Sequence, residues 1–361
     1  MKLNRNWRCL LLMGGIILWG AQPVQSASLF DQLVEKSRAE MSKKQGKLNV
    51  AMEWNKTEGV PVLQAFQKDF PFVKEVSYTR ERNVENMQRV LMEAKQGRTP
   101  RYDIMHVSSE SWTNYEEAGL FVKPPFDFKE MAKSLPADWG AIDARAFDPE
   151  GYFIGTTALA RGNAWNPQSV PKGKEPTTWD ACLDPMWKGK FLYDPRPKLT
   201  ALWYDPKTRE AHLKWLEGVK RNGVLNRGQT ENLEKVIAGE FPLVCGVNYH
   251  SASELIEKGA PLKFVFPDPF PIDMGTQIHV VKWSKTPATT QLYVLWLASK
   301  GQPQVDKQGY RGFPWNEKST KYALAKGKYV AVCDAKCTNK EDEYINLHAT
   351  ILNLPGVRKK K

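Results

Sequence analysis

Apolar and polar positions after residue 46 alternate between patterns typical of strands and of helices. Short apolar runs predict buried strands, and stretches with apolar residues every three or four positions predict amphipathic helices. In the amino-terminal half we expect strands at 48–54, 73–78 and 102–107, and helices at 60–70 and 84–96. Strands that alternate with helices are typical of a parallel sheet covered by helices on both faces.

A second stretch of the same kind follows between about residues 156 and 270. The predicted strands are at 243–247, 262–266 and 277–282, and the predicted helices are at 208–220, 233–238, 251–258 and 289–299. Two α/β segments of similar size indicate two lobes with a cleft between them. Ligands of such sheets bind at the carboxyl ends of strands, beside helix amino termini.

The first 26 residues have the pattern of a secretory signal peptide. Lys2, Arg5 and Arg8 precede an apolar run of twelve residues at 9–20, which is too short to cross about 30 Å of hydrocarbon. Small or slim residues, Val24 and Ser26, occupy the −3 and −1 positions of a cleavage site after Ser26. We expect an exported, periplasmic protein; the alternative is an uncleaved membrane anchor.

Export changes what the cysteines predict. Cys9 leaves with the signal peptide, and an oxidising compartment permits the four others to form disulfides. Cys333 and Cys337 lie in a polar segment and are expected to close a small loop. Cys182 and Cys245 are far apart in sequence, so both a disulfide and two buried thiols stay open.

The basic excess is smaller than it first appears. The chain has 52 Lys and Arg against 40 Asp and Glu, a net charge of +12, of which the signal peptide carries three charges. Four more lie at the extreme carboxyl terminus, in 358–361. The other basic residues are dispersed and form no nucleic-acid-binding signature, so we expect no nucleic-acid partner.

Five short motifs occur in one order along nearly the whole mature chain. The most specific is PTTWDACLDPMWKGK at 176–190. The others are FQKDFP at 66–71, DIMHV at 103–107, AGE at 238–240 and KGAP at 258–261. Together they resemble periplasmic solute-binding proteins of ABC importers, in the branch that includes ferric-ion-binding proteins.

The resemblance implies an α/β protein with the two-lobed type II periplasmic-binding fold and a ligand cleft between the lobes. It implies a monomeric, non-catalytic receptor that delivers a small-molecule solute to an importer permease, without a cofactor. The crossovers between the lobes are expected at 151–159 and 273–281. The expected parts are a signal peptide (1–26), lobe 1 (27–155), lobe 2 (156–274), and a return to lobe 1 with carboxyl-terminal helices and tail (275–361).

The resemblance also gives a test for iron. Ferric-ion binders of this branch use a His after the first strand, a carboxylate at the next corner and a Tyr-Tyr pair. This sequence has Asn55 in place of the His, Glu110 one or two places late, and Tyr249-His250 in place of the tyrosines. Ferric binding is therefore the alternative, with Glu110 and His250 recruited, and we expect no metal site.

These departures instead favour a small anionic or polar organic solute. Ser108 and Ser109 at a helix start offer hydroxyl and backbone N–H groups to an anion. Lys56 or Arg161 would neutralise its charge. The candidate ligand-binding residues are Trp54, Asn55, Lys56, Ser108, Ser109, Thr200, Tyr249 and His250.

Several of these residues also have a purely structural interpretation. Ser108 and Ser109 would cap a helix, Trp54 would pack in a lobe core, and Arg161 would brace the hinge through a salt bridge. His250 would make ordinary hydrogen bonds. Tyr249 is the strongest candidate, because the family register and its chemistry agree.

A periplasmic partner of a sensor kinase would use the same fold, and the sequence does not separate it from a transport receptor. An exported cleft enzyme is the last hypothesis. It would use Cys182 or Cys245 as nucleophile and His250 as base. The sequence has no GxSxG elbow and no HExxH motif, and neither cysteine lies at a predicted ligand corner. We therefore expect no catalytic residues.

Overall fold

The computed structural model describes residues 27–80, 84–107, 114–338 and 340–354. Ser108 and Ser109 of the predicted site, Glu110 and the predicted signal peptide lie outside these ranges. Within them, no helix is both long and apolar enough to cross a membrane.

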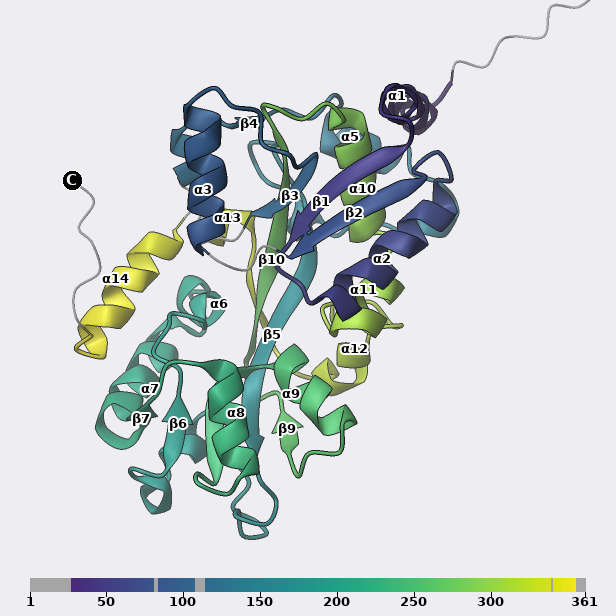
Figure 1. Ribbon diagram of the computed structural model, residues 1–361. Coiled ribbons are helices and arrows are strands. Elements are labelled where there is room, and N and C mark those ends of the chain that lie inside the picture. Colours follow the sequence, from purple (N-terminus) through teal and green to yellow (C-terminus); the bar gives the residue numbers. More distant parts are fainter. Residues whose placement is uncertain (1–26, 81–83, 108–113, 339, 355–361) are drawn as a thin grey trace, which may run out of the picture.

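The first lobe, at the top of Figure 1, is built on three parallel strands. β2 and β3 flank β1, and the antiparallel strand β10 follows β3. The elements before the first crossing are α1 (Leu29–Lys43), β1 (Lys47–Met52), α2 (Lys56–Asp69), β2 (Glu75–Arg80), α3 (Val84–Lys95), β3 (Ile104–Val107), β4 (Phe121–Val122) and α5 (Phe128–Lys133).

The second lobe, at the bottom of Figure 1, repeats this plan. β8, β6 and β7 are parallel neighbours, and β8 pairs with the antiparallel strand β5. Its elements are β6 (Phe191–Tyr193), α6 (Thr200–Tyr204), α7 (Arg209–Asn222), β7 (Val224–Leu225), α8 (Gln229–Ile237), β8 (Leu243–Asn248), α9 (Tyr249–Glu257) and β9 (Lys263–Val265). The three parallel strands of the first lobe were all predicted. In the second lobe β8 was, whereas the predicted strands at 262–266 and 277–282 are the antiparallel strands β9 and part of β10.

Two long strands carry the chain between the lobes. β5 (Gly155–Trp165) leads into the second lobe and β10 (Phe270–Val281) leads back, and the two pair antiparallel. They join both sets of strands into one sheet of eleven strands in the described part of the chain. The elements after β10 are α10 (Pro287–Ala298), α11 (Gln302–Gly309), α12 (Thr320–Ala325), β11 (Val330–Cys333), α13 (Ala335–Thr338) and α14 (Glu341–Ile351).

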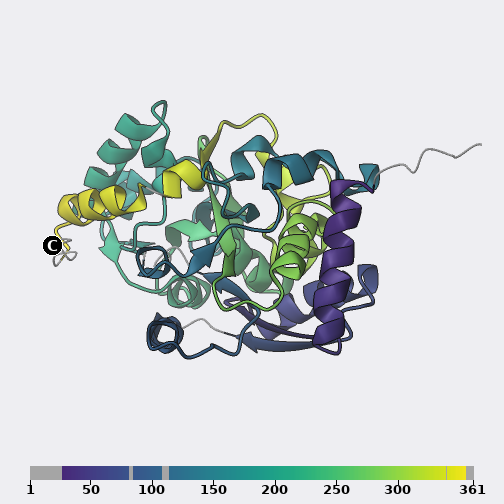
Figure 2. The ribbon, with the colours of Figure 1, turned by 90° about the horizontal axis from the view of Figure 1, so that it is seen from above.

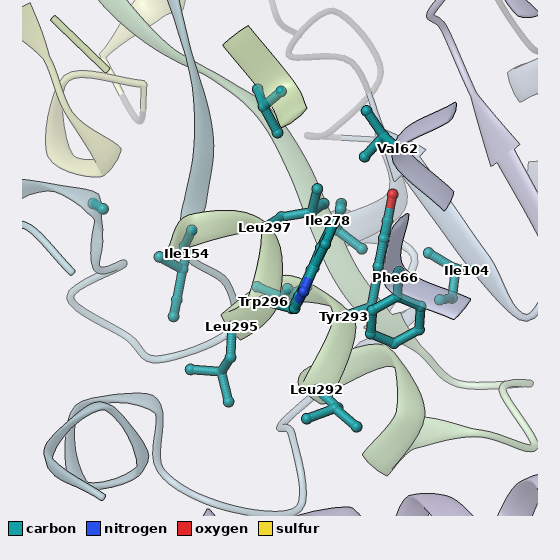
Figure 3. Packing of buried hydrophobic residues seen from close by; sticks show 14 of the residues in the cluster. Val62, Phe66, Ile104, Ile154, Ile278, Leu292, Tyr293, Leu295, Trp296 and Leu297 are labelled. Atoms are coloured by element: carbon teal, nitrogen blue, oxygen red, sulfur yellow. The ribbon is translucent and has the colours of Figure 1, made fainter. Parts of the chain in front are cut away.

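The core of the first lobe surrounds α10. Every residue of this helix from Ala288 onward is buried, as expected of a helix that is apolar on all sides. Figure 3 shows Tyr293 and Trp296 of α10 close to Phe66 of α2, and the Phe66 and Tyr293 ring centroids are 5.0 Å apart. Trp296 also donates its indole N–H to Asp69 over 2.7 Å, which fixes α10 against α2.

The carboxyl-terminal helix does not return to the first lobe. α14 contacts α6 and α7. Tyr344 of α14 and Leu352, which directly follows the helix, belong to the core of the second lobe. Figure 2 shows α1 and α14 at opposite ends of the molecule. The described part of the segment 275–361, which ends at residue 354, is therefore shared between the lobes.

Four cysteines form two disulfides. Cys333 and Cys337 are joined as predicted, with Cα atoms 4.9 Å apart. Cys182 and Cys245 are also joined, with a Cα separation of 6.6 Å, which decides between the two alternatives that the sequence left open. The second bridge ties the 3₁₀ segment Asp180–Leu183 to β8 inside the second lobe.

Candidate functional site

The crossing strands and their neighbours bring five residues into one row between the lobes, three of them polar. Asp273 of β10 is opposite Leu159 of β5 on one side and Cys333 of β11 on the other. Arg161 of β5, on the same face as Leu159, is opposite Asn248 at the end of β8. This row lies at the floor of a cavity, because all five residues line it.

The cavity has a volume of about 830 Å³ and takes its walls from both lobes. Volumes of 300–1,000 Å³ are typical of sites for small molecules. The first lobe and the crossing strands contribute Glu53, Asn55, Glu58, Arg80, Leu159, Arg161, Asp273, Met274, Gln277 and Arg311. The second lobe contributes residues from α6, α8 and α9 and from the segment before α6, among them Arg196, Lys198, Thr200, Gln229, Asn248 and His250.

The charges of this lining balance. Its basic residues are Arg80, Arg161, Arg196, Lys198, Lys258 and Arg311, and its acidic residues are Glu53, Glu58, Glu231, Glu254, Asp273 and Glu341. Arg161 pairs with Asp273, and Arg311 pairs with Glu58 over 3.1 Å. The site therefore offers charges of both signs instead of a field of one sign.

Several polar atoms of the floor are hidden from water and have no hydrogen-bond partner among the described residues. They are Arg161 Nε, Gln229 Nε2, Asn248 Oδ1 and Asp273 Oδ1. Gln229 is held in place because its Oε1 accepts the backbone N–H of Asn248 over 2.9 Å. A buried polar atom without a partner costs about 1–3 kcal/mol. A solute that formed hydrogen bonds with these atoms would recover that free energy.

The sequence-predicted residues of the first lobe lie in three different environments: the cavity lining, the surface and the core. Asn55 lines the cavity, whereas Lys56 is exposed at the start of α2 and is not part of the lining. Trp54 is buried in the core, where its ring meets His106 edge to face at 5.7 Å between centroids and lies under the Arg311 guanidinium. Burial and the nearby Arg311 charge lower the pKa of His106 to about 3, so it is neutral.

The predicted residues of the second lobe also separate. Thr200, the first residue of α6, and His250, the second residue of α9, both line the cavity. Tyr249 does not belong to the lining; its ring lies in the core, 5.2 Å from Phe264 and 5.1 Å from Phe266 between centroids. The structure thus brings Asn55, Thr200 and His250 to one cavity and places Trp54 and Tyr249 behind its walls.

Sequence reasoning missed part of the floor. Gln229, Asn248 and Asp273 were not among the candidates, and Arg161 was considered only as a charge or a brace. The available signal was Asn248-Tyr249, a polar residue at the carboxyl end of a predicted strand. The register of β5 against β8 and β10, which brings these residues together, is a tertiary property.

The described part of the chain offers neither a cluster of metal ligands nor a free thiol at the cysteines of the nucleophile hypothesis. It contains no group of three His, Cys, Asp or Glu side chains that would hold a metal ion. Both cysteines of the nucleophile hypothesis are bonded to each other, so neither is a thiol. The structure therefore gives no support to a Cys182 or Cys245 nucleophile.

Two α/β lobes, two crossing strands and a cavity between them define the class of two-lobed solute-binding proteins. The sequence is matched over residues 62–329 by the family of bacterial extracellular solute-binding proteins. The chain belongs to this family, and it is a solute-binding protein of the kind that serves ABC transporters. No curated protein sequence gives a match.

Solved structures show the same fold. Iron-bound HitA from Pseudomonas aeruginosa has 18% identity and a TM-score of 0.63, over 84% of this chain and 99% of that one. Ferric iron-binding protein A from Mannheimia haemolytica, in an open conformation, has 17% identity and a TM-score of 0.65, over 84% and 98% of the two chains. The Atu4243-GABA receptor has 13% identity and a TM-score of 0.61, over 87% and 100%. The predicted resemblance and fold class are confirmed.

Proposed function

We propose that this chain is exported with removal of residues 1–26 and acts in the periplasm as a monomeric receptor. It captures a small polar organic solute with an anionic group and delivers it, chemically unchanged, to the permease of an ABC importer. The cavity between the lobes carries this proposal. Its floor is made by the crossing strands, so a solute bound there contacts both lobes and the hinge at once.

The lining supports an anionic group of low charge. Arg161 and Arg311 are almost completely buried, and donors held in a site of low water content bind an anion more strongly than exposed ones do. The acidic half of the lining would repel a polyanion. A solute with one anionic group and further polar atoms fits this balance best.

Ferric binding is not favoured by the side chains present. Similar structures include an iron-bound protein and a GABA receptor, so the fold is compatible with either kind of solute. Fe(III) requires anionic oxygen ligands. Here Asn55 lines the cavity at the expected His position, and the Tyr249 ring is packed in the core.

The proposal is tested by thermal unfolding of the purified mature protein with a panel of ferric salts, phosphonates, organic acids and polyamines. A solute at 100 times its Kd stabilises the folded protein by about 2.7 kcal/mol. Stabilisation by an organic acid or phosphonate is expected, and stabilisation by ferric salts alone contradicts the proposal. Mass spectrometry of small molecules that co-purify with the protein identifies the solute independently.

A pair of variants on α9 tests whether the solute binds in this cavity. His250→Ala removes a cavity residue and should weaken binding of whichever panel compound stabilises the protein. Ile256→Ala changes an exposed residue of the same helix outside the lining and should leave binding unchanged. Equal effects of the two variants would exclude this cavity as the site.

A further inference from the structure

The last described part of the chain lies outside the family match and is nevertheless built into both lobes. The match ends at residue 329, just before β11. We call residues 330–338 and 340–354 the carboxyl-terminal strap. Figure 1 shows it in yellow, ending in α14 alongside the second lobe. It is a third passage of the chain between the lobes, after β5 and β10.

The strap begins with β11, which is hydrogen-bonded to a crossing strand. β11 pairs in parallel with β10 from Phe270 to Asp273, so Cys333 lies opposite the carboxylate that binds Arg161. The Cys333–Cys337 disulfide then closes the chain into a short loop. Asp334 accepts the backbone N–H of Cys337 over 2.9 Å, which fixes the same loop by a hydrogen bond.

The strap ends on buried anchors in the second lobe. The Tyr344 hydroxyl and His212 Nε2 are 2.9 Å apart, and the Tyr193 hydroxyl and His348 Nε2 are 3.1 Å apart. Tyr344 also stacks on Trp203 with ring centroids 5.4 Å apart. Because these groups are buried, separating α14 from α6 and α7 would expose aromatic surface and leave polar groups without partners.

Between its two ends the strap borders the solute cavity. Cys333, Thr338 and Glu341 belong to the lining. Glu341 is partly buried at the start of α14, whereas Glu343, two residues later, is exposed and outside the lining. The strap therefore brings a carboxylate and a hydroxyl to the cavity that the family-matched part of the chain does not supply.

We propose that the strap is a specificity-determining wall of the solute site, held in place by its ties to both lobes. Glu341 selects a solute that carries a cationic or hydrogen-bond-donating group in addition to its anionic group, and Thr338 lies beside it. The ties limit how far the lobes separate about the β5–β10 hinge. The selectivity part rests on the proposed function, whereas the tie is independent of any solute.

The tie is tested by cutting the strap in the intact protein. A protease recognition sequence inserted after Thr338 permits cleavage with both anchors retained, so the uncut protein is its own control. Spin labels on unnatural amino acids at exposed Lys68 of α2 and Glu217 of α7 report the distance between the lobes. Cleavage should shift the distance distribution to longer values and broaden it. An unchanged distribution would refute the tie.

The wall is tested with a pair of charge-neutralising variants. Butanoate, 4-aminobutanoate and butylamine serve as probes in calorimetric titrations. Glu341→Gln should lower the affinity for 4-aminobutanoate by about tenfold or more, as expected for loss of a charged hydrogen bond. The affinity for butanoate should change little. Glu343→Gln should change neither. Equal losses in both variants, or no preference of the unmodified protein for 4-aminobutanoate over butanoate, would overturn the wall.

The two proposals fail in different ways. Binding of 4-aminobutanoate that Glu341→Gln does not alter refutes the selective wall and keeps the organic-acid receptor. Failure of every probe and of the wider panel refutes the receptor for organic acids and the wall together. The distance measurement decides the tie in both cases.

Discussion

The guanidinium of Arg161 pairs with the carboxylate of Asp273, and this ion pair links the two strands by which the chain passes between its lobes. The Arg161 side chain is 4% exposed and that of Asp273 is 21% exposed, so the carboxylate is the more exposed partner, although both residues line the cavity. The pair is therefore a brace between the crossing strands and part of the cavity lining, which joins two interpretations that the sequence kept separate.

The unequal burial of this pair predicts unequal effects of removing each partner. Asp273→Ala leaves a buried guanidinium without its counter-charge and should lower the free energy of unfolding by about 3–5 kcal/mol. Arg161→Met leaves the partly exposed carboxylate of Asp273 without its counter-charge, so the loss should be nearer 1–3 kcal/mol. Urea unfolding of both variants measures the difference, and a larger loss for Arg161→Met would contradict this account.

Acid should destabilise the protein through its buried histidines. Burial, helped by the nearby His348, lowers the pKa of His212 to about 3, and burial lowers the pKa of His348 to about 4. Between pH 6.5 and these values the unfolded chain binds protons that the folded protein does not. Stability is therefore full above pH 6.5 and falls toward pH 4, by up to about 1.4 kcal/mol per pH unit for each histidine.

A single variant separates this effect from the titration of carboxylates. His212→Gln retains a polar partner for the Tyr344 hydroxyl but does not titrate. Its stability at pH 7 should be lower than that of the unmodified protein, and its loss between pH 6.5 and 4.5 should be smaller. Urea unfolding at both pH values measures these losses. If the free energy of unfolding falls equally in the variant and in the unmodified protein, His212 is not the group responsible.

The sequence predicted the alternation of strands and helices because hydrophobic periodicity is local. The predicted strand at 277–282 leaves out the first half of β10, which contains Pro271. Proline is normally excluded from inner strands because it donates no ladder hydrogen bond. Pro271 is nevertheless within β10 at its start, opposite Ala331 of β11. Only the tertiary pairing shows that the strand continues through it.

The site was predicted less completely than the fold for a related reason. Asn55, Thr200 and His250 follow strand ends or begin helices, and such corners are visible in a sequence. The direction in which an aromatic ring points is not visible, so Trp54 and Tyr249 could not be assigned to core or cavity. The floor residues become neighbours only through strand register, which no local pattern encodes.

Tyr249 should behave as a core residue when it is truncated. Its ring packs on Phe264 and Phe266, and Tyr310 meets it edge to face at 6.2 Å between centroids. Tyr249→Ala should therefore lower the free energy of unfolding by about 3–5 kcal/mol. Tyr249→Phe keeps the packing, so it should keep both stability and solute affinity. A stable Tyr249→Phe protein with weakened solute binding would instead show a ligand role for the hydroxyl.

The two disulfides should differ in what they contribute. Cys182 and Cys245 are 63 residues apart in sequence, whereas Cys333 and Cys337 are 4 apart. Because a longer closed loop removes more entropy from the unfolded chain, Cys182→Ala/Cys245→Ala should cost about 4 kcal/mol and Cys333→Ala/Cys337→Ala about 2 kcal/mol.

Urea unfolding without reductant measures both losses, and thiol labelling gives the check on the native protein. The mature protein should react with no equivalent of iodoacetamide until it is denatured and reduced, because each of the four cysteines is bonded. Labelling of Cys182 or Cys245 in the native state would contradict the bridge and restore the nucleophile hypothesis. Equal losses from the two double variants would show that local contacts, rather than loop length, decide how much each bridge stabilises the protein.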